Sequence, residues 1–199
     1  MELPVNKIKS TRVNPKSMVI FSQPKMGKTT VVAELDNCLI IDLEDGSQFV
    51  DALKYDVIKK SKEEGKIPFI VLKELIEAIR EANEKKGGYT YKYIAIDTVT
   101  ALEDIVLPLA NKMYQSTPQG KNWKGDDVTE LAQGAGYRFT RRALSTVINS
   151  LEGICDTLII LGHVKDKLIE KNGEEMNERG LALAGKMPAI LCSKVDAIG

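Results

Sequence analysis

The feature that most constrains the fold is a nine-residue segment that joins a short apolar run to a helical pattern. The apolar run is Met18–Phe21, and residues 22–30 read Ser-Gln-Pro-Lys-Met-Gly-Lys-Thr-Thr. They follow the pattern G-x-x-x-x-G-K-[ST] except at its first position, where Ser22 replaces glycine. In such a loop, backbone N–H groups and a helix N-terminus surround an anion. The segment therefore predicts a strand, a phosphate-binding loop and a helix, in that order.

The residue types of this loop fit the binding of a magnesium nucleotide such as ATP. We expect Gly27 to let the backbone approach the phosphates, Lys28 to neutralise the β- and γ-phosphates during catalysis, and the Thr29 hydroxyl to bind Mg²⁺. The residues expected to hold ATP are Gln23, Pro24, Lys25, Met26, Gly27, Lys28, Thr29 and Thr30. The alternative is a chance Gly-Lys-Thr in an ordinary loop, but the strand before it and the helix after it favour nucleotide binding.

A second apolar run ends in an acid. Residues Tyr93–Asp97 read Tyr-Ile-Ala-Ile-Asp. A buried strand that ends in an acid is common by chance, but after a phosphate-binding loop it is typical of the Walker B carboxylate, which binds Mg²⁺. We therefore expect Thr29 and Asp97 to hold the magnesium ion.

Hydrolysis also needs a group that orients the attacking water. Many ATPases carry a glutamate directly after the Walker B aspartate, but here that residue is Thr98. The best candidate is Glu44, which follows the apolar run Leu39–Leu43 and so lies at the strand edge where open α/β sheets bind ligands. Asp42 and Asp45 are neighbouring substitutes, and a helix-capping role is the alternative for Glu44.

The single histidine follows the last apolar run. That run is Thr157–Leu161, and His163 stands two residues after it. A lone histidine is usually structural, but at a strand end in a nucleotide-binding domain it is placed to touch the γ-phosphate. We expect His163 to sense this phosphate and to report it to the segment that follows.

Apolar runs alternate with helical patterns along the chain. The runs that predict buried strands are Met18–Phe21, Leu39–Leu43, Tyr93–Ile96 and Thr157–Leu161. Their alternation with helices predicts an α/β fold with a mostly parallel central sheet and helices on both faces. One helix is expected to start with a capping box of Thr100 and Glu103 and to end or kink at Pro108.

The composition is that of a globular protein. The 199 residues are 43% hydrophobic, and 28 Lys and Arg balance 28 Asp and Glu. No apolar run reaches 18 residues, and the N-terminus lacks the apolar stretch of a secretory signal. Cys38, Cys155 and Cys192 lack zinc-site spacing and suit a reducing cytosol. We expect a cytoplasmic protein with no membrane partner, organised as a basic arm over residues 1–17 and one domain over residues 18–199.

Two segments do not fit the alternation of strands and helices. Met113–Gly136 is polar and is expected to be a long loop with one short helix near Val128–Gln133. Val164–Leu181 contains Asn172-Gly173, a strong two-residue turn signal, and is expected to be an exposed hairpin.

Together these residues resemble the RecA-like branch of P-loop ATPases. The features that carry the resemblance are Glu44 after the second strand, Asp97-Thr98 in place of Asp-Glu, and His163 before a hairpin. More closely, the chain is similar to the small phage-encoded AAA-type nucleotide-binding proteins. Those proteins carry the Pro-Lys-x-Gly-Lys-Thr loop seen here at residues 24–29 and a histidine at the strand end.

The resemblance extends from Val19 to Asp196 and implies a RecA-like fold that hydrolyses ATP with Mg²⁺. Some members of this group act as single-strand annealing recombinases. The resemblance therefore also implies single-stranded DNA, further copies of the chain in a homo-oligomer, and a single-strand-binding or replication protein as partners in the host cytoplasm. The group usually continues past a final Val-Asp strand, seen here as Val195-Asp196, so we expect a C-terminal truncation.

In RecA-like proteins two irregular segments bind single-stranded DNA, and the two segments described above match them in position. The residues that we assign to DNA contact are Lys121, Trp123 and Lys124 in the first segment, Lys165 and Lys167 in the second, and Lys112 and Arg138, which flank the first segment. The cations would contact phosphates, and Trp123 would stack on bases. Two alternatives stay open for the region of Arg138, namely a solvated helix face and an arginine finger that reaches the ATP of a neighbouring subunit.

The sequence thus predicts a RecA-like ATPase coupled to single-stranded DNA in phage recombination, annealing or replication. Two other functions are compatible with the residues. One is an ATP-gated switch or loader that recruits a replication protein with little turnover. The other is a P-loop small-molecule kinase, although the segment Met113–Gly136 offers no arginine for a lid over an acceptor.

Overall fold

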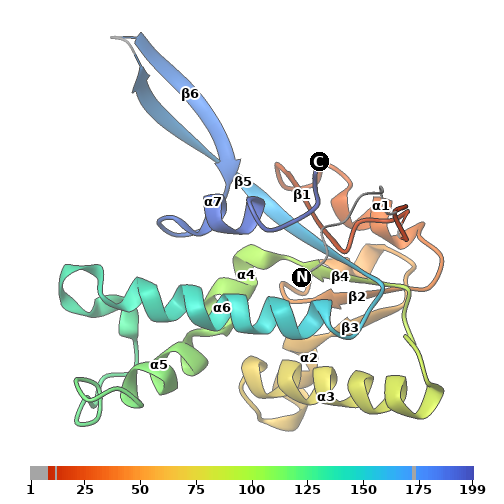
Figure 1. Ribbon diagram of the computed structural model, residues 1–199, viewed down its shortest axis with the longest axis horizontal. Helices are drawn as coiled ribbons and strands as arrows, with labels where there is room; N and C mark the ends of the chain where they lie inside the picture. The colour runs from red at the N-terminus through yellow and green to blue at the C-terminus, as the bar shows by residue number, and fades with distance from the viewer. Residues whose placement is uncertain (1–8, 12, 172–173) are drawn as a thin grey trace, which may run out of the picture.

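The computed structural model describes residues 9–11, 13–171 and 174–199, without the side chains of residues 167–178. Its centre is a sheet of seven strands in the order β3-β2-β4-β5-β1-β7, with β6 paired to β5 outside this path (Figure 1). All pairs along the path are parallel, and the β5–β6 pair is antiparallel. The strands are β1 (Ser17–Ser22), β2 (Cys38–Asp42), β3 (Lys54–Asp56), β4 (Tyr93–Asp97), β5 (Thr157–Lys171), β6 (Glu174–Leu181) and β7 (Ala197–Ile198).

Helices cover both faces of this sheet, as the sequence predicts. They are α1 (Lys28–Ala33), α2 (Val57–Glu64), α3 (Pro68–Lys86), α4 (Val99–Ile105), α5 (Leu107–Gln115), α6 (Gly136–Glu152) and α7 (Met187–Cys192). Three short 3₁₀ turns occupy Ser47–Phe49, Val128–Glu130 and Ala132–Gly134. The four predicted strands are confirmed, whereas β3, α2 and α7 are additional elements whose short or charged sequences give no clear periodic signal.

The two faces of the sheet are packed unequally. Alternate residues of one strand enter different cores, so that Leu39 and Ile41 join a large cluster with α3, α4 and α6. Cys38 and Ile40 point the other way, into a small cluster that includes Val32 of α1. Cys155 is buried like Cys38. The double-sided burial explains why the strands are apolar on both faces.

The start of α4 differs from the prediction. Its N-cap is Thr98, whose hydroxyl accepts a hydrogen bond from the Ala101 backbone N–H at 3.4 Å. The predicted capping box of Thr100 and Glu103 is therefore wrong. Glu103 instead accepts hydrogen bonds from the Ala184 backbone N–H at 3.0 and 3.1 Å, which ties α4 to the segment before α7. The helix is therefore capped at its N-terminus as the sequence predicts, but by Thr98, two residues before Thr100.

The segment expected as one long loop is partly ordered by aromatic packing. Helix α5 runs to Gln115, and the break between α4 and α5 falls just before Pro108, as predicted. Tyr114, in the last turn of α5, packs edge-to-face on Trp123 and on Phe139 of α6, with ring centroids 5.2 Å apart in each pair. The short helix expected near Val128–Gln133 is present as two 3₁₀ turns.

The predicted hairpin is formed by β6 and the second half of β5. Val164 pairs with Leu181, and the antiparallel register continues to Lys171 and Glu174. The predicted turn at Asn172-Gly173 lies outside the described residues. Figure 1 shows the hairpin projecting from the body of the molecule. The first half of β5 lies inside the parallel sheet, so one strand belongs to both structures.

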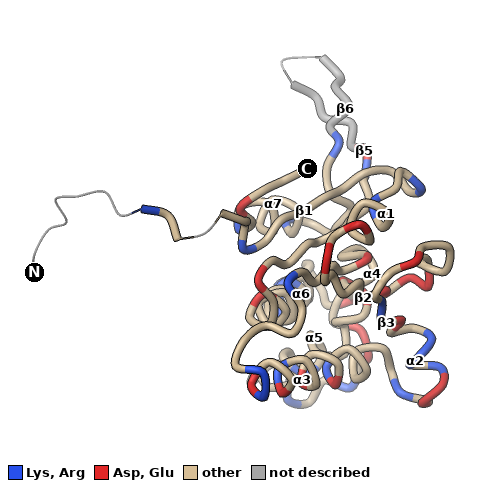
Figure 2. The backbone as a smooth tube through the Cα atoms, turned by 90° about the vertical axis from the view of Figure 1, so that its right-hand side faces the viewer, with Lys and Arg blue, Asp and Glu red and all other residues tan. Residues whose placement is uncertain are grey.

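Of the predicted N-terminal arm, residues 1–8 and 12 lie outside the described part of the chain. Near its end, the Lys16 backbone N–H donates to the Asp196 carboxylate at 2.6 Å, which joins the start of β1 to the residue before β7. Acidic and basic residues are mixed along α2 and α3 (Figure 2). Among the described residues, no helix is long and apolar enough to cross a membrane.

Candidate nucleotide-binding site

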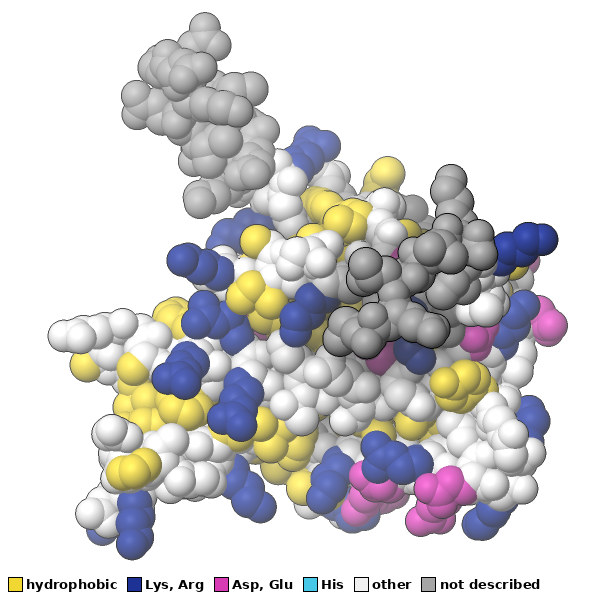
Figure 3. Space-filling model, viewed as in Figure 1, with side chains coloured by type: hydrophobic (Ala, Val, Ile, Leu, Met, Phe, Trp, Pro, Cys, Tyr) yellow, Lys and Arg dark blue, Asp and Glu magenta, His cyan; other side chains and the backbone are white. Residues whose placement is uncertain are grey.

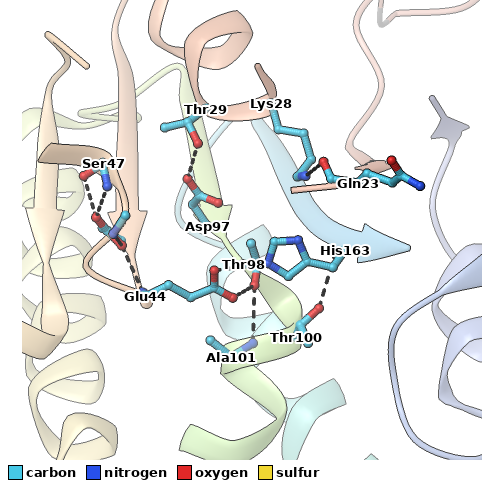
Figure 4. Close-up of polar contacts among 12 residues, drawn as sticks. Gln23, Lys28, Thr29, Glu44, Ser47, Asp97, Thr98, Thr100, Ala101 and His163 are labelled. Carbon is cyan, nitrogen blue, oxygen red and sulfur yellow. Dashed lines mark hydrogen bonds and ion pairs between the residues drawn. The ribbon is translucent and has the colours of Figure 1, made fainter. Parts of the chain in front are cut away.

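The strand register brings the predicted site residues to one edge of the sheet. Asp42 of β2 pairs with Asp97 of β4, and Ser22 of β1 pairs with His163 of β5. Because these strands are neighbours and parallel, their carboxyl ends meet, which is where open α/β sheets bind ligands. Figure 4 shows the side chains converging on this edge.

A cavity of about 410 Å³ opens at this edge. Its lining residues are Pro24, Lys25, Gly27, Lys28, Thr29, Thr30, Asp42, Glu44, Gly46, Val50, Asp97 and His163. Six of the eight residues predicted to hold ATP are among them. Gln23 and Met26 are not: the Gln23 carbonyl accepts from Lys28, and the Met26 side chain is 69% exposed.

The loop itself has the backbone shape that anion binding requires. Gly27 has φ +83°, a left-handed conformation that glycine adopts without strain, and it stands directly before α1. The Lys28 ammonium donates to the Ser22 carbonyl at 3.1 Å, the Ser22 hydroxyl at 3.2 Å and the Gln23 carbonyl at 3.0 Å. The serine that replaces the first glycine of the pattern therefore adds one hydrogen-bond acceptor for the Lys28 ammonium.

Lys28 lies in an environment that makes a negative ligand favourable. Burial lowers the pKa of its ammonium below the ordinary value, and the nearby carboxylates of Asp97 and Glu44 oppose this shift. A buried ammonium without full compensation gains from the approach of a phosphate.

Thr29 and Asp97 form the predicted metal pair. The Thr29 hydroxyl donates to Asp97 Oδ2 at 2.6 Å. Burial raises the pKa of the Asp97 carboxyl; the Thr29 hydrogen bond lowers it, but the charges of Asp42 and Glu44 add to the rise, and the net shift is upward. A bound cation would stabilise the charged form of Asp97. A hydroxyl and a carboxylate also supply oxygen ligands, which Mg²⁺ prefers. The described residues contain no group of three or more His, Cys, Asp or Glu arranged to hold a metal ion.

Asp42 shapes the loop that carries Glu44. Its carboxylate is 1% exposed and accepts from the backbone N–H groups of Glu44, Gly46 and Ser47 at 3.0, 3.3 and 2.9 Å, and from the Ser47 hydroxyl at 2.5 Å. Burial alone raises the pKa of this carboxyl, but these hydrogen bonds outweigh it, and the net pKa is lowered. Asp42 is thus a structural residue of the loop rather than a substitute for Glu44.

The Glu44 carboxylate is held at both oxygens. The Thr98 hydroxyl donates to Oε1, and the His163 ring nitrogen Nε2 lies 3.1 Å from Oε2. The backbone N–H of His163 donates to the Thr100 hydroxyl at 3.4 Å. The structure therefore brings Glu44 and His163, predicted independently, into direct contact at the mouth of the cavity.

A family model described as an AAA domain matches residues 14–199 of the chain. The chain belongs to the AAA domain family. This membership supports an AAA-type P-loop NTPase, that is, a nucleotide-binding ATPase domain. No match to the chain is found among curated proteins.

Sequence reasoning missed two side chains that shape the site of this AAA domain. Ser47 and Thr98 fix Asp42 and Glu44, respectively. The signal for Ser47 was weak, since Asp45-Gly46 suggests only a turn. The signal for Thr98 was stronger, because its place directly after the Walker B aspartate was evident from the sequence.

The residues assigned to DNA are not among those that line the cavity. Lys112, Lys121, Lys124, Arg138 and Lys165 are exposed, whereas the Lys167 side chain lies outside the described residues. Trp123 is half-buried against Tyr114, which limits the ring surface that it offers to a base. Figure 3 shows Lys and Arg side chains dominating the left half of this face, whereas Asp and Glu gather in the right half.

Proposed function

We propose that the AAA domain binds Mg-ATP in the 410 Å³ cavity and hydrolyses it to ADP and phosphate. One observation carries the proposal: a lysine ammonium, a hydroxyl–carboxylate pair and a hydrogen-bonded glutamate face the same cavity from the carboxyl ends of β1, β2 and β4. Each group matches one requirement of phosphoryl transfer, namely charge neutralisation, metal binding and orientation of water.

Binding uses the loop between β1 and α1. The β- and γ-phosphates take the place beside Lys28 that the Ser22 and Gln23 carbonyls now fill, because a phosphate oxygen is a stronger acceptor for an ammonium. The N-terminus of α1 and the left-handed backbone at Gly27 offer N–H groups to the same oxygens. Thr29 and Asp97 hold Mg²⁺, which supplies neutralisation of the charge on the β- and γ-oxygens.

Hydrolysis uses Glu44. An ionised carboxylate has about four acceptor positions, and Thr98 and His163 occupy one on each oxygen. The remaining positions can accept from a water and aim its oxygen at the γ-phosphorus. As the water oxygen bonds to phosphorus, Glu44 takes one of the two water protons, the bond to the bridging oxygen breaks, and ADP takes that electron pair. The proton on Glu44 then passes to the released phosphate, which keeps the other water hydrogen as a hydroxyl.

His163 is the proposed sensor of the γ-phosphate. Its Nε2 contacts Glu44, and within the described part of the chain its buried Nδ1 has no hydrogen-bond partner. A neutral imidazole has one N–H to donate, so a donation to the γ-phosphate would replace the one to Glu44. His163 is also the last residue of β5 paired with β1 and directly precedes the hairpin. The state of the phosphate would thereby reach the hairpin through one residue.

The first test is a pair of variants measured for binding and turnover. Lys28→Ala should abolish ATP binding, because the loop loses its cation. Glu44→Gln should keep binding and lower kcat by about 10²- to 10⁴-fold, because the amide orients water poorly and cannot hold its proton. Glu77→Gln, on the exposed side of α3, is the matched control and should hydrolyse ATP at the wild-type rate. A wild-type rate in Glu44→Gln would show that the base lies elsewhere.

We further propose that turnover is coupled to single-stranded DNA, as in phage recombination, annealing or replication, with a homo-oligomer as the working form in the cytoplasm. The support is the family resemblance of the motifs, the projecting hairpin and the cationic half of the face in Figure 3. A single-strand-binding or replication protein is the proposed further partner.

The DNA proposal is tested by steady-state ATP hydrolysis with and without single-stranded DNA at two salt concentrations. DNA should raise the rate, and the effect should fade with salt, because phosphate contacts release counterions. Replacing Lys121, Lys124 and Arg138 by glutamine should remove the stimulation without changing the basal rate. Replacing Lys85 and Lys86 at the end of α3 is the control. A rate indifferent to DNA would favour the ATP-gated switch, and transfer of labelled phosphate to a small acceptor would favour a kinase.

A further inference from the structure

Thr98 occupies a distinctive place in the site. It is the single residue between β4, which ends at Asp97, and α4, which begins at Val99, and it is 1% exposed. Two groups contact its hydroxyl: the Ala101 backbone N–H donates to it at 3.4 Å, and the Glu44 carboxylate accepts from it.

The direction of these hydrogen bonds is fixed by chemistry. The Ala101 N–H can only donate, so it uses a lone pair of the hydroxyl. An ionised carboxylate can only accept, so the single hydroxyl proton points to Glu44. A threonine side chain is also stiff at χ1 because it is branched at Cβ. The donor that Glu44 meets is therefore held in place from the backbone of α4.

Glu44 depends on such a support. It reaches the cavity from the loop after β2, whereas the metal ligand Asp97 belongs to the neighbouring strand β4. The Leu43 N–H donates to the Asp97 carbonyl at 2.7 Å, which joins the two strand ends at the backbone level only. Beyond that point the Glu44 side chain has three rotatable bonds, and its contacts with Thr98 and His163 decide where the carboxylate lies.

We propose that Thr98 is a positioning residue that fixes the Glu44 carboxylate in the orientation needed to aim the attacking water. The inference rests on the proposed ATPase function and assigns a role to the residue that stands where a glutamate follows the aspartate in many ATPases. The site thus keeps a polar group at this place, but it uses the group to hold a carboxylate that comes from the adjacent strand.

The test compares Thr98→Val with Thr98→Ser. Valine keeps the shape and loses the hydroxyl, so kcat should fall about 10- to 100-fold, the size expected when a reacting group is misplaced by about 1 Å. The dissociation constant of a non-hydrolysable ATP analogue should change less than about threefold, since the hydrogen bonds of the Thr98 hydroxyl go to Glu44 and Ala101, which lie outside the phosphate loop. Serine keeps the hydroxyl and should restore kcat to within about threefold of wild type.

A double-mutant cycle separates positioning from a general structural effect. If Thr98 acts through Glu44, Thr98→Val should not lower kcat further in a Glu44→Gln background, because the group that it positions is already disabled. Asn83→Ala is the stability control. Asn83 makes hydrogen bonds to the Ile154 carbonyl and the Thr90 N–H before the amino ends of β5 and β4, far from the cavity. It should lower the melting temperature without lowering kcat.

A second readout does not depend on turnover. The sequence contains one histidine, so the ring ¹⁵N signals of the untagged protein report on His163 alone. Its Nε2 lies 3.1 Å from Glu44 Oε2. Thr98→Val and Glu44→Gln should both shift these signals, whereas Thr98→Ser and Asn83→Ala should leave them near wild type.

The outcomes distinguish the inference from the function on which it rests. A wild-type rate in Glu44→Gln overturns the assignment of the base, and the positioning role with it. A slow Glu44→Gln together with a Thr98→Val that keeps the wild-type rate and ring signals overturns only the positioning role. A loss of rate in Thr98→Val that adds in full to the Glu44→Gln loss also overturns it and makes Thr98 a structural cap.

Discussion

The carboxyl ends of β2 and β4 make an instructive pair. Asp42 and Asp97 face each other in the strand register and are both buried, yet the pKa of Asp42 is lowered and that of Asp97 is raised. Asp42 accepts four hydrogen bonds from its own loop. Within the described part of the chain, the Asp97 carboxylate accepts one, from the Thr29 hydroxyl. Two aspartates at equivalent positions therefore differ in how far the protein itself satisfies them.

This difference separates a structural carboxylate from a functional one. Burial disfavours the charge of both residues, and the number of donors decides the net result. Asp42 is satisfied by the chain and has little capacity left for a ligand. The Asp97 carboxylate lines the cavity and has lone pairs left over after the bond from Thr29, so it can coordinate a cation.

The largest expected effect concerns Asp97. Asp97→Asn should lower Mg²⁺-dependent ATP hydrolysis by at least about 100-fold, because an amide is a weaker ligand for a hard cation than a carboxylate. Steady-state rates over a Mg²⁺ titration measure the effect, with Asp104→Asn on the exposed side of α4 as the control. Equal losses in Asp97→Asn and Asp104→Asn would break the comparison.

The next effect concerns the stability of the loop after β2. Asp42→Asn should lower the free energy of unfolding by about 2–3 kcal/mol, because hydrogen bonds to a charged acceptor are lost and an amide NH₂ faces backbone donors. Urea denaturation measures it, and Asp51→Asn, at an exposed position, should stay within about 0.5 kcal/mol of wild type. If both variants are equally stable, the hydrogen bonds of Asp42 contribute nothing net.

The pH dependence of stability should carry the same signature. The folded pKa of Asp42 lies below its unfolded value, so its contribution is present at pH above the unfolded pKa and is lost as pH falls through the folded pKa. Asp42→Asn should therefore flatten the acid side of the profile of unfolding free energy against pH. An acid side as steep in Asp42→Asn as in wild type would assign acid unfolding to other carboxylates.

The smallest effect should have the opposite sign. Asp97 has a raised pKa, so its charged form is disfavoured in the fold without a cation. Asp97→Asn should raise the unfolding free energy of the nucleotide-free protein by up to about 1 kcal/mol, since it removes a buried charge beside Asp42 and Glu44. Thermal unfolding should show this gain without Mg-ATP and a deficit with it. A destabilised nucleotide-free variant would contradict the contrast with Asp42.

The sequence predicts the site well because parallel strands align their carboxyl ends. Lys28, Glu44, Asp97 and His163 each follow or end an apolar run, and the fold brings all four runs to one edge. The same spacing indicates an AAA-type P-loop NTPase, which the family match supports, whereas the phage recombinase type stays a prediction. The positions of these residues at the ends of predicted parallel strands are therefore enough to predict that they lie close together.

The rest of the fold depends on contacts that no local pattern encodes. Both Thr98 and Thr100 could serve as the N-cap of α4 from the sequence alone. In the fold, Thr98 takes this position, and its hydroxyl is hydrogen-bonded to Ala101 and Glu44. The polar segment after α5 is ordered by Tyr114 and Phe139, which are 25 residues apart in the sequence. The edge strand β3 has only three residues, Lys-Tyr-Asp, and is held by backbone pairing with β2. Its side chains therefore show no apolar pattern from which a strand could be predicted.

Strand β5 is continuous from the central sheet into the hairpin, so the two parts are rigidly connected. The hairpin part of this strand, Val164–Lys171, is about 26 Å long at about 3.3 Å per residue. It grows without a break from the residue that touches Glu44. A tilt of about 10° at this root would carry the far end by about 4–5 Å over that length. If His163 responds to the γ-phosphate as proposed, a small rearrangement at this residue would move the far end of the hairpin by a distance large enough to change its contacts with a neighbouring molecule.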